Sequence, residues 1–137
     1  MQDTKSILIA KAREARKMSY CPYSGKSVGA ALLCDDGSIF TGSNIENAAY
    51  SPTVCAERVA LFCAIHDGKR KFKAIAVSGG DKESLASGFT PCGVCRQVLF
   101  ELCGAELEVI LGDGKGSPSL YKLSELLPLG FGEKDIK

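Results

Sequence analysis

The centre of the chain carries the run Ala74-Ile75-Ala76-Val77, four consecutive apolar residues that are soon followed by Gly79-Gly80. An unbroken apolar run of this length is typical of a strand in a sheet that is covered on both faces. Apolar residues recur at helical spacing on either side of it, from Cys55 onward and again over residues 95–102. The first of these helices is also apolar on its opposite side, which predicts a helix buried all round.

The remaining patterns extend this arrangement in both directions. A first helix is expected to end before Pro22, and a turn at residues 35–37 joins two strands into a hairpin. Two strands and a short helix stopped by Pro128 follow near the end of the chain. These outer elements are expected at residues 8–18, 28–34, 38–42, 107–111, 119–122 and 123–127. The resulting order, α-β-β-α-β-α-β-β-α, predicts an α/β fold, a three-layer α/β/α sandwich with a mixed five-stranded sheet.

Length and charge narrow the class of protein. The 137 residues suffice for one core, so we expect a single domain spanning residues 1–137. Seventeen Lys and Arg against sixteen Asp and Glu give a formal net charge of +1, which offers no broad footprint for nucleic acid. No apolar stretch approaches the roughly 20 residues that span a bilayer, and the first residues lack a signal peptide's apolar middle. We therefore expect no membrane partner and a cytoplasmic location.

The seven cysteines are the outlier in composition. An odd number argues against a disulfide framework and leaves buried thiols, redox chemistry or metal binding. Three of them, Cys55, Cys92 and Cys95, lie where the two central helices are expected to begin. The partial positive charge of a helix N-terminus favours thiolates, the form that binds metal. Three thiolates would leave one corner of a tetrahedral zinc ion open, as in catalytic zinc sites.

Glu57 lies two residues after Cys55, and positions two apart on a helix point roughly 200° away from each other. Both side chains can face one site only if the helix begins close to Cys55. A carboxylate placed there could move protons beside the metal. The alternative is an ordinary acidic residue in the first turn, where it stabilises the helix dipole.

Six segments spread over nearly the whole chain fit one known pattern. They are Cys21-Pro22-Tyr23-Ser24, Val28-Gly29-Ala30-Ala31-Leu32, Asn44-Ile45-Glu46-Asn47-Ala48, Cys55-Ala56-Glu57-Arg58, Pro91-Cys92-Gly93-Val94-Cys95-Arg96-Gln97-Val98 and Glu125-Leu126-Leu127-Pro128. In this order they resemble the small homotetrameric zinc-dependent cytidine deaminases of the three-cysteine type. Two segments carry the Cys-x-Glu and Pro-Cys-x-x-Cys signature of zinc deaminases. The resemblance implies a cytidine deaminase-like fold and hydrolysis of cytidine and 2'-deoxycytidine to the uridines and ammonia, in pyrimidine salvage.

The resemblance also implies roles around the metal. One zinc ion per subunit would be held by the three cysteines and would activate a water molecule, with Glu57 as the proton shuttle. Three thiolates leave the zinc site with a net charge of −1, so compensating cations are expected nearby. Arg58 and Arg96 each follow a site residue directly, and both are expected to reach sulfur.

Further residues are implied on the substrate side. Asn44 and Glu46 form an amide and carboxylate pair suited to the hydroxyls of a ribose, and Ala56 is expected to contact the substrate. Phe131, between two glycines near the end of the chain, and Tyr50 are expected to reach a neighbouring subunit's site in a homotetramer. The family places an aromatic residue where this chain has Lys26, so that stacking contact is not implied here.

Two other functions remain open at this point. The same chemistry could serve another cytosine-containing substrate, either a modified nucleoside or a polynucleotide. The zinc could also be non-catalytic and stabilise an assembly module, in which case the metal site would be closed and Glu57 dispensable.

Overall fold

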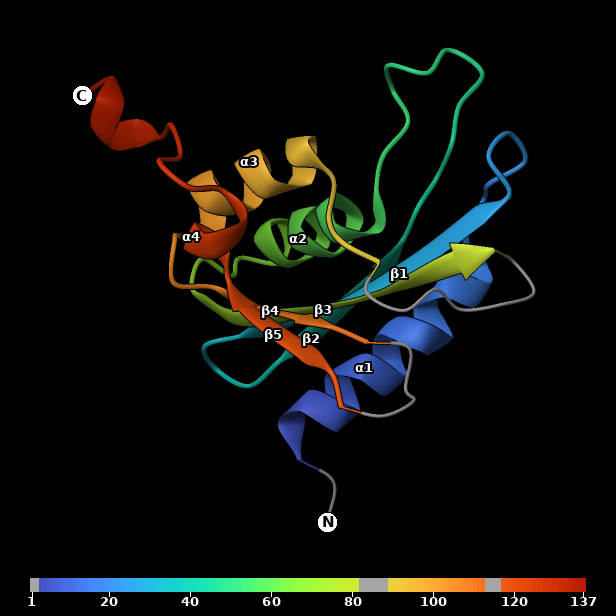
Figure 1. The fold of residues 1–137 in the computed structure, drawn as a ribbon, viewed down its shortest axis with the longest axis horizontal. Helices are drawn as coiled ribbons and strands as arrows, with labels where there is room; N and C mark the ends of the chain where they lie inside the picture. The colour runs from blue at the N-terminus through green and yellow to red at the C-terminus, as the bar shows by residue number, and fades with distance from the viewer. Residues whose placement is uncertain (1–2, 82–88, 113–116) are drawn as a thin grey trace.

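A mixed five-stranded sheet forms the middle layer of the molecule (Figure 1). The computed structural model describes residues 3–81, 89–112 and 117–137. The strands are β1 (Lys26–Cys34), β2 (Ile39–Ser43), β3 (Phe72–Asp81), β4 (Glu108–Leu111) and β5 (Ser119–Lys122), in the order β2-β1-β3-β4-β5. β3 and β4 run parallel, whereas the other neighbouring strands are antiparallel. The predicted mixed sheet is confirmed.

Helices cover both faces of this sheet, as Figure 1 shows. On one face lies α1 (Thr4–Ala15), whose Leu8 and Ala12 pack in one apolar cluster with Ala31 and Ala76. On the other face lie α2 (Ala56–His66), α3 (Gly93–Cys103) and α4 (Leu123–Leu126). Alternate residues of each strand point to opposite faces of the sheet. The strand residues next to these two alanines in sequence therefore belong to a second apolar cluster, on the other face. The predicted three-layer sandwich is confirmed, and no helix within the described ranges is long and apolar enough to cross a membrane.

Two expectations about the helices are wrong in detail. The first helix ends before Pro22 as expected, but it stops at Ala15 instead of residue 18, and the tighter 3-10 turn that follows, Arg16–Met18, leaves Met18 exposed. α2 is not buried all round, because Phe62 is 46% exposed and Cys63 lies on the surface. α2 belongs to an outer layer, so only the side that faces the sheet is covered, and its buried residues are Ala56, Glu57, Ala60, Leu61 and Ala64.

The central strand β3 extends on both sides of the apolar run that predicts it, from Phe72 to Asp81. β3 pairs with β1 along the whole length of β1, from Lys26 opposite Asp81 to Cys34 opposite Phe72. Backbone hydrogen bonds hold this ladder whatever the side chains are, so the strand continues past its apolar run, and Ser78, Gly79 and Gly80 beyond the run are buried as well.

Two glycines allow the helices to lie close to the sheet. A Cβ atom on Gly29 of β1 would lie 1.9 Å from the carbonyl oxygen of Ala12 in α1. A Cβ atom on Gly42 of β2 would lie 2.5 Å from the backbone nitrogen of Ala60 in α2. Because backbone atoms cannot move aside as side chains do, the distance between layers depends on the absence of a side chain at both positions.

We predict that Gly29→Ala destabilises the fold by about 1–3 kcal/mol or more, because its Cβ would push α1 away from the sheet. Urea unfolding followed by circular dichroism measures this loss. The matched control is Gly112→Ala, whose Cβ would meet Ile9 Cδ1, the mobile end of a side chain, at 3.3 Å. Equal stability of Gly29→Ala and the unmodified chain would contradict the close approach.

Candidate metal and substrate site

On the face of the sheet opposite α1, the helices α2 and α3 each begin directly after a cysteine. Cys55 is the N-cap of α2 and Cys92 is the N-cap of α3, and both have extended backbone conformations. The backbone N–H of Cys95, in the first turn of α3, donates to the Cys92 sulfur at 3.5 Å. The sequence condition for Glu57 is met, since α2 begins directly after Cys55 and the carboxylate belongs to its first turn.

The three sulfurs meet at one point between these helix starts. The Sγ atoms of Cys55, Cys92 and Cys95 all lie within 4.8 Å of one another, and those of Cys55 and Cys92 are 3.6 Å apart. Zinc–sulfur bonds of about 2.3 Å in a tetrahedron require sulfurs about 3.8 Å apart. Cys95 is buried, Cys55 half-buried and Cys92 exposed, so the cluster is open on the Cys92 side. The donor set fits zinc, which prefers thiolates at tetrahedral spacing.

Electrostatics at the cluster favour one thiolate even without metal. A hydrogen bond from the Cys95 thiol lowers the pKa of Cys55 to about 5, and the same bond raises the pKa of Cys95. Arg58 adds to this effect, since its Nη2 donates to the Cys55 sulfur at 3.5 Å. A guanidinium placed there offsets the negative charge that three thiolates bring to a zinc ion.

Glu57 is a buried acid beside this cluster, only 3% exposed. Burial, and to a lesser extent the Cys55 thiolate, raise the pKa of its carboxyl to about 7. The carboxyl also interacts with Cys95. A buried carboxyl that interacts with two of the three thiols is placed to exchange protons with a group bound among them.

Arg96 does not reach sulfur, contrary to the expectation from sequence. Its Nε donates to the Pro91 carbonyl oxygen and its Nη1 to the Leu126 carbonyl oxygen, both at 2.8 Å. Carbonyl oxygens are stronger hydrogen-bond acceptors than sulfur, and these two lie within reach of the guanidinium. Arg96 therefore ties the segment before Cys92 to the end of α4, and supports the site through the backbone.

A cavity of about 330 Å³ is lined by two of the residues predicted to bind substrate. It is lined by Tyr23, Ser24, Glu46, Asn47, Tyr50 and Thr53. The lining therefore includes Glu46 and Tyr50 from the predicted set, and Tyr50 is 78% exposed. Ser24 also lines the cavity without a role predicted from sequence, although it lies within one of the segments that carry the family resemblance.

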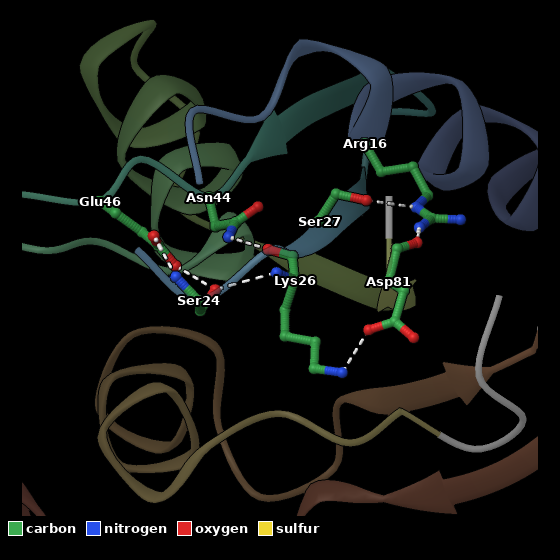
Figure 2. A network of polar contacts seen from close by, with 7 residues as sticks. All are labelled: Arg16, Ser24, Lys26, Ser27, Asn44, Glu46 and Asp81. Carbon is green, nitrogen blue, oxygen red and sulfur yellow. Dashed lines mark hydrogen bonds and ion pairs between the residues drawn. The ribbon is translucent and has the colours of Figure 1, made fainter. Parts of the chain in front are cut away.

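Asn44 is buried and does not line this cavity, and Figure 2 shows its amide bonded to the Lys26 carbonyl. Its Oδ1 accepts from the backbone N–H of Val28 at 2.8 Å, and its Nδ2 donates to the Lys26 carbonyl at 2.9 Å. Both ends of the amide thus bind the backbone of β1. In this structure Asn44 holds the segment after β2 against β1 and so helps to place Glu46.

The other two predicted substrate contacts lie apart from the cavity lining. Ala56 is fully buried at the start of α2. Phe131 is 58% exposed in the C-terminal segment, where its carbonyl accepts from Gln97 Nε2 of α3 at 2.8 Å. An exposed aromatic ring on a segment that is anchored by its backbone is available to another chain.

Comparison with known proteins assigns the family. The family model described as the cytidine and deoxycytidylate deaminase zinc-binding region matches residues 2–111, which include all three cysteines and Glu57. The chain belongs to the cytidine deaminase family. The predicted family is therefore confirmed, and the match to a zinc-binding region together with the sulfur cluster confirms zinc as the cofactor.

Relatives of known name agree over almost the full chain. The chain is 49% identical to a cytidine deaminase of Sporosarcina psychrophila, over 94% of this chain and 92% of that protein. It is 48% identical to one of Halalkalibacterium halodurans, over 96% and 97%. The crystal structure of a cytidine deaminase from Burkholderia pseudomallei superposes with a TM-score of 0.86 at 44% identity, covering 94% of this chain and 100% of that one. The cytidine deaminase-like fold is confirmed.

We predict that replacing Cys55, Cys92 or Cys95 singly by Ala removes most of the bound zinc, about one ion per chain in the unmodified protein. Elemental analysis of purified, dialysed protein measures the zinc content. Cys63→Ala is the control, because that thiol lies exposed on the surface of α2. Retention of full zinc by all three variants would contradict the assignment of the ligands.

Proposed function

We propose that the chain catalyses the hydrolytic deamination of cytidine and 2'-deoxycytidine to uridine and 2'-deoxyuridine, with release of ammonia. The observation that carries the proposal is the buried carboxyl of Glu57, which lies in the same helix turn as one thiol of an open three-sulfur cluster. An open metal corner and an adjacent acid are what a hydrolytic deaminase needs, whereas a purely structural zinc site needs neither.

Each residue has a part in the reaction. Zinc held by Cys55, Cys92 and Cys95 would supply a Lewis acid that makes water a nucleophile at neutral pH. Glu57 accepts a proton from the attacking water and delivers it to N3 of the pyrimidine as C4 is attacked. It then takes the proton of the new hydroxyl group on C4 and delivers it to the departing amino group, so that cytidine and water become uridine and ammonia. Its burial keeps the proton from exchanging with bulk water during these transfers.

Two arginines support this chemistry in different ways. Arg58 contacts the Cys55 sulfur and withdraws charge from the thiolate, which preserves the electrophilic character of the metal. Arg96 fixes the position of the Pro91–Cys92 backbone through its hydrogen bonds to the Pro91 and Leu126 carbonyls.

The cavity beside Glu46 binds the sugar. The carboxylate accepts hydrogen bonds from ribose hydroxyls. Asn44 supports this sugar site by holding the segment of Glu46 against β1. Tyr50 lines this cavity, whereas Ala56, fully buried between Cys55 and Glu57, would contact the substrate beside the metal and not in the cavity. A substrate that lacks a sugar would lose these interactions, so a nucleoside is favoured over the free base.

The working enzyme is a homotetramer with shared active sites. Large apolar side chains are exposed on the isolated chain, as expected for a surface that self-associates. They include Phe62, Val94, Leu120, Tyr121, Leu129, Phe131 and Ile136. In this assembly Phe131 and Tyr50 of one subunit contribute to the site of another.

The setting of the reaction follows from its chemistry. Residues 1–137 form a single domain. The product of the reaction, a uridine nucleoside, can re-enter nucleotide synthesis, so the enzyme acts in pyrimidine salvage. The three thiols must stay reduced to hold zinc, and a cytoplasmic location provides that condition. A polynucleotide substrate is disfavoured by the net charge of +1, and it is tested directly below.

We predict that the purified protein converts cytidine to uridine, followed by the change in ultraviolet absorbance, and that a zinc chelator abolishes this activity. Glu57→Gln should lower kcat/KM by about 10²–10⁴-fold while zinc is retained, because only the proton transfer is removed. Deamination of a single-stranded oligonucleotide in preference to cytidine would favour the alternative substrate. Unchanged activity in Glu57→Gln would refute the mechanism.

We predict that Phe131→Ala raises KM for cytidine by about 10–100-fold, the usual worth of one base–aromatic contact. Since the ring would act in a neighbour's site, subunit exchange between the Phe131→Ala and Glu57→Gln proteins should restore part of the activity. A mixture of Glu57→Gln with the Glu57→Gln/Phe131→Ala double variant is the control and should stay inactive. No recovery in the first mixture would argue against shared sites.

A further inference from the structure

Two segments far apart in the sequence run side by side at the sugar cavity. The backbone N–H of Tyr20 donates to the Asn44 carbonyl at 3.0 Å, and that of Glu46 donates to the Tyr20 carbonyl at 2.8 Å. These bonds hold the loop of residues 21–25 against the segment that follows β2. These bonds therefore hold the backbone of Glu46 in place independently of its side chain.

The loop then binds the carboxylate of Glu46 directly. Oε1 accepts from the backbone N–H of Tyr23 at 3.0 Å and from that of Ser24 at 3.1 Å. Oε2 accepts from the Ser24 hydroxyl, as Figure 2 shows. Ser24 thus contacts both carboxylate oxygens.

The direction of the hydroxyl bond follows from its surroundings. The backbone N–H of Lys26 donates to Ser24 Oγ at 2.9 Å, so the oxygen acts as an acceptor on that side. An ionised carboxylate can only accept, and the hydroxyl hydrogen must therefore point to Glu46. The chain of bonds runs in one direction, from Lys26 N–H through the Ser24 hydroxyl to Glu46.

The donor end of this chain is itself braced (Figure 2). The ammonium of Lys26 pairs with the carboxylate of Asp81 at the end of β3, and the carbonyl of Asp81 accepts from the guanidinium of Arg16. Arg16 Nε also donates to the Ser27 hydroxyl at 2.9 Å. These contacts hold the first residues of β1 and so hold the N–H that orients Ser24.

We infer that Ser24 is a positioning residue for sugar recognition, which aims the Glu46 carboxylate at the hydroxyls of a ribose or 2'-deoxyribose nucleoside. The inference rests on the proposed function, in which Glu46 binds the sugar. A glutamate side chain has three rotatable bonds, and holding it in one rotamer before the substrate arrives removes an entropic cost of binding. Without the Ser24 hydroxyl, Oε2 loses a donor that helps to fix the plane of the carboxylate.

Ser24→Ala tests this on substrates that differ only in the sugar. We expect kcat/KM to fall about tenfold for cytidine and for 2'-deoxycytidine, the loss typical of a hydrogen bond to a charged group. For 2',3'-dideoxycytidine, which lacks both the 2'-hydroxyl and the 3'-hydroxyl, we expect a change of less than about twofold. An equal loss on all three substrates, or no loss on any, would overturn the inference, since either result uncouples Ser24 from the sugar hydroxyls.

Three further variants separate positioning from folding. Ser24→Thr keeps the hydroxyl and should restore most of the discrimination between cytidine and dideoxycytidine. In the Glu46→Ala background, Ser24→Ala should cause no further loss on cytidine, because the group through which it acts is gone. Ser38→Ala removes a similar bond, from Ser38 Oγ to Asp36 Oδ1 at 2.6 Å, at the opposite end of β1 and should leave all three substrates unaffected. Additive losses in the double variant would overturn the inference.

The unmodified protein distinguishes this inference from the proposed function. If the zinc-loaded protein turns over no cytidine, the proposed function fails and the inference fails with it. If it turns over cytidine faster than dideoxycytidine and Ser24→Ala keeps that ratio, only the inference fails. The second result would leave Glu46 as a sugar ligand that needs no support from Ser24.

Discussion

The convergence of three sulfurs between two helix starts is the constraint on which the rest of the site depends. Cys55 and Cys92 are both N-caps, so their side chains precede the helices instead of lying on a helix face. Only this placement lets Glu57, two residues after Cys55, share the site. The sheet beneath α2 and α3 holds the two helix starts together, and the fold thereby assembles a metal centre from segments 37 residues apart.

The substrate side depends on a second convergence, at the edge of the sheet. The loop before β1 and the segment after β2 are joined by backbone bonds, and Asn44 and Glu46 both use their side chains to bind that loop or β1. Asn44 and Glu46, which the sequence predicts to bind ligand, therefore also hold the structure of the site together. The close approach of α1 and α2 to the sheet at Gly29 and Gly42 keeps this arrangement compact.

The secondary structure could be predicted because the local spacing of apolar residues indicates which residues can be buried. Each predicted helix and strand exists, and β5 has the expected bounds, Ser119–Lys122. The errors have a common origin, since apolar spacing reports which residues can be buried and not what covers them. Phe62 fits a buried helix by type, yet α2 lies in an outer layer. β3 is longer than its apolar run because backbone hydrogen bonds to β1 extend the strand through residues of any type, including the buried Ser78 and the two glycines that follow it.

The sequence by itself determined the order of elements, the three thiols, the nearby acid and the family, because each of these depends on residue types within short segments of the chain. Only the tertiary structure decided which groups meet across long separations. Arg96 follows the last cysteine but bonds to Leu126, and Ser24 meets a carboxylate 22 positions later in the chain. Such contacts follow from the geometry of packed layers, in which sequence distance carries no information about spatial distance.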